Sequence, residues 1–364
     1  MVTPHLPPYQ AANALLPDQL GRALRTAGHG VGFLSFGPGP DTEEVRFVRR
    51  RGRRWRATRV PQLLEALATW HQARGPIAQS DVVHVHSNTW VNQVAARLAR
   101  RRGRPYVLTH YGTEIWHHDG RDPRFRRLNR DARHVTFYSH ALLERGRELR
   151  VPLPEVSVVY PPVSDHFRPL GEPARSAARE RLLGGGDLLL VNVKRLHPLA
   201  DQATLLEAVA IVRRERPGVR LLLAGAGVEE PRLRERAAQP DLEGAVRLLG
   251  LVPNPELPGL VGAADAFVLS SLLEATPTVA LEALACGTPV LSSDNPGGIE
   301  LAGLFGQDVQ VVPKQRPEAL ARAILDLGAA PRRAAAATLE RIEADFRLAG
   351  VARRYLGIYQ RAIA

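Results

Sequence analysis

The stretch AFVLSSLLEATPTVALEALACGTPVLSSDNPGGIEL (residues 266–301) contains a strand, a loop, a helix and a second strand in close succession. Its first six residues form a short apolar run, which predicts a buried strand. Pro277 is predicted in the first turn of the helix, where its missing N–H costs nothing. Gly287 is predicted to end that helix, and the Thr-Pro pair after it prevents the helix from resuming. The stretch therefore predicts one strand–helix–strand unit.

Two carboxylates in this unit, Glu274 in the loop and Glu282 in the helix, are separated by seven residues. Residues 279–285 are otherwise apolar, and a lone carboxylate on a buried helix is costly unless it is paired or bound. The start of a helix attracts phosphate through free N–H groups and its dipole. A nucleotide-sugar would suit this arrangement, with Glu274 facing the sugar and Glu282 binding ribose. An equally good interpretation is that Glu282 pairs with an arginine and Glu274 faces solvent.

Strand-like runs alternate with helix-like segments along most of the chain. Such alternation predicts right-handed strand–helix–strand units and parallel sheets. The length of 364 residues and a Pro-rich connection at 161–173 indicate two domains. We therefore predict an α/β fold of two Rossmann-like, doubly wound domains that face a central cleft. The predicted strands are 30–36, 81–87, 105–111, 135–139, 156–160, 188–194, 219–224, 246–251, 266–271, 290–294 and 309–312, and the main predicted helices are 13–27, 205–216 and 317–327.

The composition favours a reducing compartment and an anionic partner. Cys286 is the single cysteine, which excludes a disulfide framework. The first residues lack the pattern of a signal peptide, and no run of 18 apolar residues is present. We therefore expect a cytoplasmic protein, with peripheral contact at the anionic inner face of the membrane as an option. The net charge of +12 suits nucleotide diphosphates, acidic glycans or anionic lipids.

Two arginine-rich segments, 46–59 and 121–133, contribute much of this charge. The simplest interpretation is solvated surface in an arginine-biased protein. A second interpretation places one or both near the acceptor or an anionic surface. Nucleic acid is the least favoured partner, because no helix-turn-helix, RNA-recognition or zinc pattern accompanies them. His84 and His86 share a strand face, and we interpret them as buried, hydrogen-bonded histidines rather than metal ligands.

The second half of the chain contains several short motifs in a fixed order. They are KRLHPLADQATLLEAV (194–209), LLLAGAG (221–227), VRLLGLVPNPELPGLVGAADAFVLSS (246–271), EATPTVALEALACGTPVL (274–291) and GGIE (297–300). DVVHVH (81–86), YVLTHYGTE (106–114) and VVYPPVSDHFRP (158–169) are looser matches in the first half. Each motif is weak alone, but the ordered set resembles the retaining glycosyltransferases of family 4, which have the two-domain GT-B fold.

The resemblance implies roles for particular residues. Glu274 matches the first Glu of the family's E-x7-E signature, which contacts the donor sugar, and Glu282 matches the second, which holds the ribose. Arg195 matches the arginine that neutralises the leaving diphosphate. His110 and Tyr111 lie where the family carries a histidine that faces the donor sugar, so they and Glu274 are the catalytic candidates. The other implied contacts are Lys194, Ala12, Asn13, Thr276, Thr278 and Val279 for the diphosphate, and Gly250, Leu251 and Val252 for the base.

Several family features are altered in this chain. The family's lysine, five residues after the arginine, is replaced by Ala200, and glycines after the first Glu are replaced by Ala275 and Pro277. The site must stabilise the growing charge of a leaving diphosphate. We therefore hypothesise that Lys194 or another arginine supplies the missing charge. No D-x-D pair is present, so no metal or other cofactor is expected.

The resemblance implies a metal-independent, retaining hexosyltransferase that uses a nucleoside-diphosphate sugar, with UDP-sugars as the commonest donors of the family. The acceptor would be a glycan, a lipid-linked saccharide or a small molecule. The implied domains are 1–165 on the acceptor side, 166–340 for the nucleotide-sugar, and a helix at 341–364 that crosses back to the first domain. One alternative is a GT-B nucleotide-binding or partner subunit that has lost turnover, which the altered residues motivate. Another is a sugar-nucleotide epimerase or phosphorylase on the same architecture.

Overall fold

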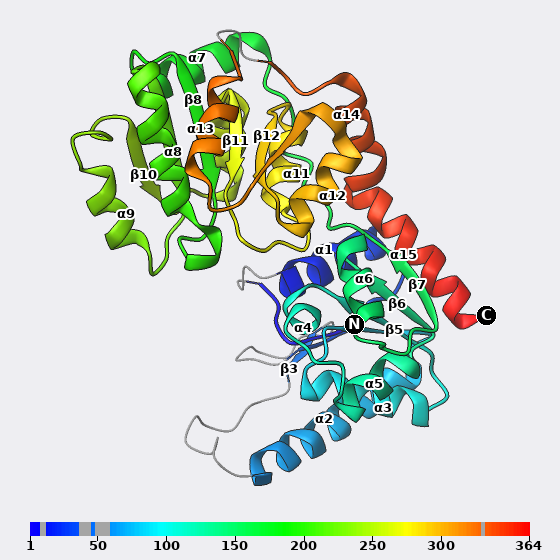
Figure 1. The fold of residues 1–364 in the computed structure, drawn as a ribbon. Helices are drawn as coiled ribbons and strands as arrows, with labels where there is room; N and C mark the ends of the chain where they lie inside the picture. The colour runs from blue at the N-terminus through cyan, green and yellow to red at the C-terminus, as the bar shows by residue number, and fades with distance from the viewer. Residues whose placement is uncertain (8–11, 36–44, 48–58, 329–331) are drawn as a thin grey trace. The chain divides into compact units, whose positions relative to one another are not determined.

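The computed structural model describes residues 1–7, 12–35, 45–47, 59–328 and 332–364. The chain divides into two compact units, which Figure 1 draws from blue to red along the sequence. The first unit comprises Met1–Pro162 and Leu348–Ala364, and the second comprises Val163–Arg347. From the sequence we expect these divisions at 165/166 and 340/341.

The described part of the first unit contains a seven-stranded sheet in the order β3-β2-β1-β4-β5-β6-β7. Neighbouring strands pair in parallel throughout. The order reverses between β1 and β4, so this sheet is doubly wound. The strands are β1 (Val2–Thr3), β2 (Phe33–Ser35), β3 (Val45–Phe47), β4 (Val83–His86), β5 (Tyr106–His110), β6 (His134–Phe137) and β7 (Glu155–Val158).

The helices of the first unit include the last helix of the chain. Tyr359 of this helix forms a 2.7 Å hydrogen bond with His84 on β4. The hydroxyl of Tyr355 lies 3.3 Å from Thr109 Oγ1 on β5. The end of the chain is therefore bonded to two central strands of the first sheet. The helices are α1 (Ala12–Thr26), α2 (Arg59–Gln79), α3 (Trp90–Arg101), α4 (Thr113–Trp116), α5 (Pro123–Arg130), α6 (His140–Glu148) and α15 (Leu348–Ile363).

The second unit contains a six-stranded parallel sheet in the order β10-β9-β8-β11-β12-β13. Its order reverses between β8 and β11. The strands are β8 (Leu188–Val193), β9 (Val219–Ala224), β10 (Val246–Gly250), β11 (Ala266–Leu269), β12 (Val290–Ser293) and β13 (Val309–Val312). The α-helices are α7 (Glu172–Leu183), α8 (Gln202–Glu215), α9 (Glu230–Ala237), α10 (Leu257–Ala263), α11 (Thr278–Ala285), α12 (Pro296–Phe305), α13 (Pro317–Leu325) and α14 (Ala336–Arg341), with short 3₁₀ turns at Pro198–Ala200, Asn254–Glu256 and Gly306–Asp308 and a π-helical turn at Ile342–Phe346.

The predicted α/β class with two parallel sheets is confirmed, and each predicted strand has a counterpart in the structure. β1 and β3 are not predicted from the sequence: β1 has only two residues, and β3 (Val45–Phe47) enters an arginine-rich segment and is not part of an apolar run. Pro277 is corrected: it is the N-cap of α11, and the helix begins one residue later, at Thr278. The Pro277 carbonyl accepts the N–H groups of Ala280 and Leu281, as an N-cap carbonyl does.

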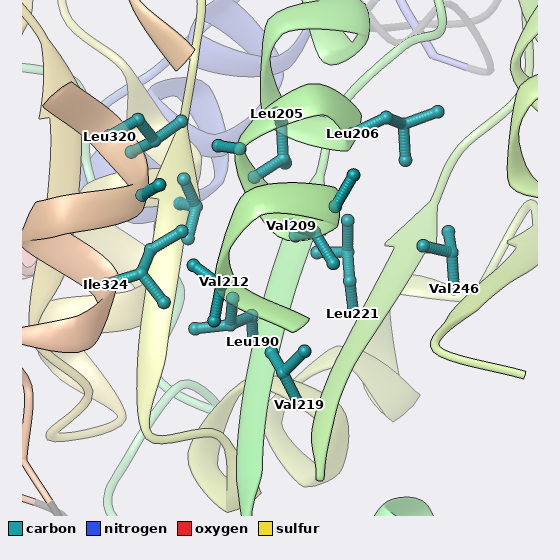
Figure 2. Packing of buried hydrophobic residues seen from close by; sticks show 14 of the residues in the cluster. Leu190, Leu205, Leu206, Val209, Val212, Val219, Leu221, Val246, Leu320 and Ile324 are labelled. Atoms are coloured by element: carbon teal, nitrogen blue, oxygen red, sulfur yellow. The ribbon is translucent and has the colours of Figure 1, made fainter. Parts of the chain in front are cut away.

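A large apolar core lies where α8 and α13 pack on the second sheet (Figure 2). Leu205, Val209 and Val212 recur at helical spacing on α8 and are fully buried. Leu320 and Ile324 approach the same cluster from α13. This packing holds β8 rigidly and so positions the residues that follow its carboxyl end.

Replacing Leu205 by Ala should destabilise the second unit by about 2–5 kcal/mol, because a fully buried leucine leaves a cavity when truncated. Leu199→Ala is the matched control, since its side chain is 47% exposed and should cost less than about 1 kcal/mol. Denaturant unfolding followed by circular dichroism measures both variants. Equal losses for the two leucines would contradict the assignment of this core.

Candidate functional site

A lysine–glutamate ion pair lies at the carboxyl edge of the second sheet, where the strand order reverses. Lys194 directly follows β8, and Glu274 lies in the loop after the neighbouring strand β11. Lys194 Nζ is 2.6 Å from Glu274 Oε1, and the two side chains are only 27% and 13% exposed. Open parallel sheets bind ligands at such reversals. The pair therefore marks the candidate site of this unit.

The loop that carries Glu274 is held by the start of α12. The Gly297 N–H donates to the Glu274 carbonyl at 3.0 Å. A Cβ at position 297 would lie 2.8 Å from Pro277 Cδ and 3.0 Å from the Ala275 carbonyl oxygen. This close approach requires glycine at position 297, and it fixes the backbone at the first of the two carboxylates.

The start of α11 presents backbone donors beside this loop. Ala280 and Leu281 already donate to the Pro277 carbonyl, whereas no described acceptor takes the N–H groups of Thr278 and Val279. Two free donors and the positive end of the helix dipole suit an anion. Two of the predicted phosphate contacts, Thr278 and Val279, are thus available in the structure, while Thr276 lies half-buried before the helix.

Glu282 lies in the second turn of α11, and no described residue forms a hydrogen bond or ion pair with its carboxyl group. Burial raises the pKa of this carboxyl group from 4.5 to about 8, although the positive charge of Lys194 acts in the opposite direction. At neutral pH the group is therefore mostly protonated and can both donate and accept a hydrogen bond. Among the described residues, no arginine pairs with Glu282, as the alternative interpretation of the sequence would require.

The loops after β8, β9 and β10 are locked together by close backbone contacts. A Cβ on Gly225 would lie 2.0 Å from the Lys194 carbonyl oxygen, and one on Gly227 would lie 2.0 Å from the Leu196 carbonyl oxygen. The Gly225 N–H donates to the Gly250 carbonyl at 2.7 Å. Only glycine allows these loops to meet.

The segment predicted to contact the base follows β10 directly. Gly250 has a φ of +68°, and its carbonyl is already bonded to Gly225. Leu251 exposes 81% of its surface, and Val252 is half-buried. The role of these three residues stays a prediction, with the backbone groups of Leu251 and Val252 as the remaining candidates.

Arg195 is exposed, and no described residue pairs with its guanidinium. It follows Lys194 at the end of β8, so an unpaired cation lies next to the Lys194–Glu274 pair in sequence. Ala200, which replaces the family's lysine, is only 4% exposed, and its carbonyl accepts a 2.8 Å hydrogen bond from Ser270 Oγ. Lys194 and Arg195 are therefore the lysine and the arginine of the described loop 194–201 that follows β8.

In the first unit, His110 is fully buried at the end of β5. Its Nε2 lies 2.8 Å from Asn129 Oδ1, and its Nδ1 lies 3.9 Å from Glu114 Oε1. The ring packs between Phe125 and Phe137, and this burial lowers the pKa of His110. His110 is thus enclosed within the first unit in this structure, and its catalytic role stays a prediction.

Tyr111 follows the end of β5 and is half-buried. Its hydroxyl lies 2.5 Å from His86 Nδ1, and its backbone N–H donates to Glu114 Oε1 at 2.6 Å. The Gly112 N–H donates to Glu114 Oε2. Glu114, which the sequence analysis does not single out, therefore holds the turn that presents Tyr111.

The two histidines of β4 are buried and hydrogen-bonded, as interpreted from the sequence. His84 contacts Tyr359 and Thr109 at 2.7 Å each, and its ring lies 3.8 Å from that of His86. Burial lowers the pKa of both imidazoles well below the usual 6.5, so both are neutral at pH 7.

The remaining predicted contacts lie in the first unit or outside the described residues. Ala12 and Asn13 are the first residues of α1, but their side chains are not among those described. The arginine-rich segment 46–59 lies mostly outside the described residues, whereas 121–133 includes α5. Across the described ranges, no three His, Cys, Asp or Glu side chains group closely enough to hold a metal ion. None of the described helices has the length and apolar character needed to cross a bilayer.

Comparison with known families identifies the chain. The model of glycosyl transferases group 1 matches residues 175–338, and that of glycosyltransferase family 4 matches residues 18–167. The D-inositol 3-phosphate glycosyltransferase of Thermobispora bispora is 32% identical over 307 residues, which cover 77% of this chain and 70% of that protein. The chain therefore belongs to the group 1 glycosyltransferases.

Other curated relatives carry different names. A glycogen synthase of Mycobacterium tuberculosis is 32% identical over 280 residues, which cover 73% of this chain and 65% of that protein. A GDP-mannose-dependent alpha-(1-6)-phosphatidylinositol monomannoside mannosyltransferase of Mycolicibacterium smegmatis is 32% identical over 250 residues, covering 66% of this chain and 65% of that protein. The chain thus spans slightly less than two thirds of the length of these two relatives.

Solved structures share the fold over nearly the whole chain. Sucrose-phosphate synthase from Thermosynechococcus elongatus matches with a TM-score of 0.76 and 21% identity, covering 99% of this chain and 95% of that one. HepE from Anabaena, solved in complex with UDP, matches with a TM-score of 0.77 and 19% identity, covering 99% of both chains. The two-unit architecture is therefore the predicted GT-B fold.

Replacing Glu282 by Gln should change how stability depends on pH. Between pH 4.5 and about 8 the folded protein holds a proton on Glu282 that the unfolded chain has released, so wild-type stability falls as pH rises through this range. Gln keeps the neutral form at every pH. We expect the stability of the variant relative to wild type to increase by about 3 kcal/mol from pH 5 to pH 8, or about 6–12 °C in Tm.

The measurement is the Tm of ligand-free protein at pH 5 and at pH 8, by circular dichroism. Glu243→Gln is the control, because Glu243 is an exposed carboxylate of the same unit and should show no such pH-dependent gain. A wild-type Tm that rises relative to that of the Glu282→Gln variant between these pH values would rule out a protonated Glu282.

Proposed function

We propose that this protein is a retaining, metal-independent hexosyltransferase that moves a sugar from a UDP-sugar to an acceptor hydroxyl. The observation that carries the proposal is the group of residues at the strand reversal of the second sheet. It combines the Lys194–Glu274 pair, the unpartnered carboxyl of Glu282 and the exposed Arg195 with the free N–H groups of α11. A nucleoside-diphosphate sugar has a complementary group for each of these features.

The diphosphate would bind at the start of α11 and to Arg195. The free N–H groups of Thr278 and Val279 supply directed donors, and an arginine can clamp phosphate with two parallel hydrogen bonds. As the bond to the sugar breaks, negative charge grows on the phosphate, and fixed donors stabilise it without reorganisation. Cations and a helix terminus can thus replace a metal ion in this role.

The ribose would bind Glu282. A half-buried, protonated carboxyl without a protein partner can donate to one ribose hydroxyl and accept from the other. Leaving such a group unpaired is costly, and a ribose diol would remove that cost.

The sugar would face Glu274, whose charge is partly neutralised by Lys194 at 2.6 Å. A carboxylate held in an ion pair is a weak nucleophile, which argues against the covalent mechanism of retaining glycosidases. We infer that Glu274 orients the sugar and stabilises positive charge at its anomeric carbon. The leaving phosphate would accept the proton of the acceptor hydroxyl on the same face, which retains the configuration.

The first unit would supply the acceptor side, with Tyr111 as its predicted contact. The acceptor is a glycan, a lipid-linked saccharide or a small molecule, and the names of the relatives cover this range. UDP as the nucleotide is supported by HepE, which was solved with UDP and with UDP-glucose. GDP is the competing base, because one relative is named as GDP-mannose-dependent.

A second candidate function is a nucleotide-binding or partner subunit without turnover. Ala200 and Pro277 support it, because the first removes a cation and the second removes a backbone donor beside the proposed phosphates. Such a protein would bind the nucleotide yet release no sugar from the donor.

We expect UDP to raise the Tm of the protein more than GDP, ADP or dTDP at equal concentration, because the ligand that binds most tightly stabilises the folded state most. Differential scanning fluorimetry measures the four shifts.

Arg195→Ala should weaken UDP binding about tenfold and lower turnover, since it removes the unpaired cation of the site. Arg322→Ala, an exposed arginine on α13, is the control and should leave the UDP shift unchanged. Differential scanning fluorimetry gives the shifts, and released UDP gives the turnover.

Three results would count against parts of this proposal. A larger Tm shift with GDP than with UDP would mean that the donor carries guanine and not uracil. An unchanged Tm shift with UDP in Arg195→Ala would mean that Arg195 does not bind the diphosphate. A clear UDP shift without hydrolysis or transfer of any UDP-sugar would favour the subunit without turnover.

The product should keep the anomeric configuration of the donor. Because the phosphate leaves and the acceptor arrives on one face, an α-linked donor should give an α-linked product. Proton NMR of the purified product measures the coupling constant of the transferred sugar's anomeric proton, whose configuration the glycosidic bond preserves. An inverted product would exclude the proposed mechanism while leaving the family assignment intact.

Addition of EDTA should leave the rate of transfer unchanged, because the proposed mechanism uses no metal ion. A rate that falls with EDTA and recovers with added Mg²⁺ or Mn²⁺ would contradict it.

A further inference from the structure

A second polar hollow lies within the first unit, between α3 and α5. Its volume is 640 Å³, which lies within the range of small-molecule sites. Six arginines line it and are accompanied by a single carboxylate, Asp131. We call it the arginine pocket, with the guanidinium groups of Arg97, Arg100, Arg101, Arg124, Arg127 and Arg130.

The pocket collects positive charge that its own residues do not neutralise. Asp131 pairs with Arg100 and, at 2.9 Å, with Arg130. No described residue pairs with Arg97 or Arg127, both of which are exposed. Like charges that converge on a hollow repel one another, and this repulsion is relieved when an anion enters.

The arginines are arranged rather than scattered. Arg97 and Arg101 are one turn apart on α3, and Arg124 and Arg127 are three residues apart on α5, so each helix presents them on one face. Arg124 lies over the ring of Trp90, with 4.8 Å between its guanidinium carbon and the ring centroid. This stacking limits the rotamers of Arg124 and prepares it to bind an anion.

The floor of the pocket is rigid. Tyr106 is buried at the start of β5, and its hydroxyl donates to the Leu128 carbonyl on α5 at 2.5 Å. Ala96 and Leu128 are buried beside it. The packed floor and the two helices hold the backbone positions from which the arginine side chains extend, which lowers the cost of arranging them around a multivalent anion.

The pocket is separate from the proposed acceptor contact. Tyr106 begins β5, whereas Tyr111 follows its other end, and five residues of strand span about 16 Å. Asp131 and Arg130 precede β6 and so also lie at the amino ends of the strands. The proposed sugar transfer takes place at the carboxyl ends of the strands, so it does not involve the positive charge of the arginine pocket.

We propose that the arginine pocket binds a ligand carrying two or more phosphate groups. Guanidinium groups pair with phosphate oxygens bidentately, and the four that do not pair with Asp131 carry more positive charge than the roughly two negative charges of one phosphate group can neutralise. The phosphates are presented either by a free polyphosphate or by neighbouring headgroups of an anionic lipid surface. This binding is independent of the proposed transferase activity.

Inorganic tripolyphosphate is the first probe, measured by isothermal titration calorimetry on the full chain. The parent protein carries Arg195→Ala, which weakens phosphate binding at the proposed donor site. Adding Arg97→Gln and Arg127→Gln should weaken tripolyphosphate binding at least tenfold. Adding Arg247→Gln and Arg322→Gln removes the same charge from exposed positions of the second unit, and should change the affinity less than twofold.

A charge-preserving variant tests the geometry. Arg97→Lys with Arg127→Lys keeps the net charge but loses the bidentate fork, so its affinity should fall between those of the parent and the Arg97→Gln, Arg127→Gln variant. Removing two unpaired, mutually repelling charges should leave the Tm equal or higher, and tripolyphosphate should raise the Tm of the parent. An affinity of the lysine variant equal to that of the parent would overturn the bidentate geometry.

Vesicles distinguish the two sources of phosphate. Phosphatidylcholine vesicles with and without 30% phosphatidic acid are sedimented with the same set of proteins. If only tripolyphosphate binding depends on Arg97 and Arg127, the ligand is a free polyphosphate. If binding to phosphatidic acid vesicles also depends on them, the ligand is a lipid surface. Either result supports the site. If the pocket variant and the surface control behave alike with both probes, the arginine pocket is solvated surface and the proposal is wrong.

Discussion

The parallel pairing of β8 with β11 brings together the two residues of the second unit, Lys194 and Glu274, that form the ion pair of the candidate site. Leu190 pairs with Ala266 and Val191 with Phe267, so the two strands run side by side through the apolar core and end at the same edge. The strand order reverses between them, and open parallel sheets bind ligands outside the carboxyl ends of the strands at such a reversal. Residues 80 positions apart in the chain, Lys194 and Glu274, meet at 2.6 Å as a consequence.

Electrostatics at this edge rest on burial and on the local balance of charge. The carboxyl of Glu282 is enclosed enough to hold its proton at neutral pH, while Glu274 is held in an ion pair by Lys194. The two carboxyl groups of one short signature thus have different surroundings: Glu274 has a cationic partner, and Glu282 has no described partner. Arg195 and the start of α11 remain free for an anion, and no described acidic side chain competes for them.

Three histidines of the first unit, His84, His86 and His110, are buried and form hydrogen bonds within it. His84 and His110 are hydrogen-bonded inside the sheet and are neutral, because burial lowers the pKa of each imidazole. Tyr111, held by Glu114 and His86, is the residue of this group that lies beyond the strand end. The bonds of His110 therefore hold the end of β5 in place, and Tyr111 directly follows this strand end.

The sequence by itself determined the α/β class, the order and approximate position of most strands, and the family, since alternating patterns and ordered motifs are local or sequential features. It also indicated that Glu282 is partly buried. The Lys194–Glu274 pair, the burial of His110 and the arginine pocket were decided only by the tertiary structure. Each depends on side chains from different elements approaching one another, and periodicity along a chain contains no information about which loops or helix faces will meet.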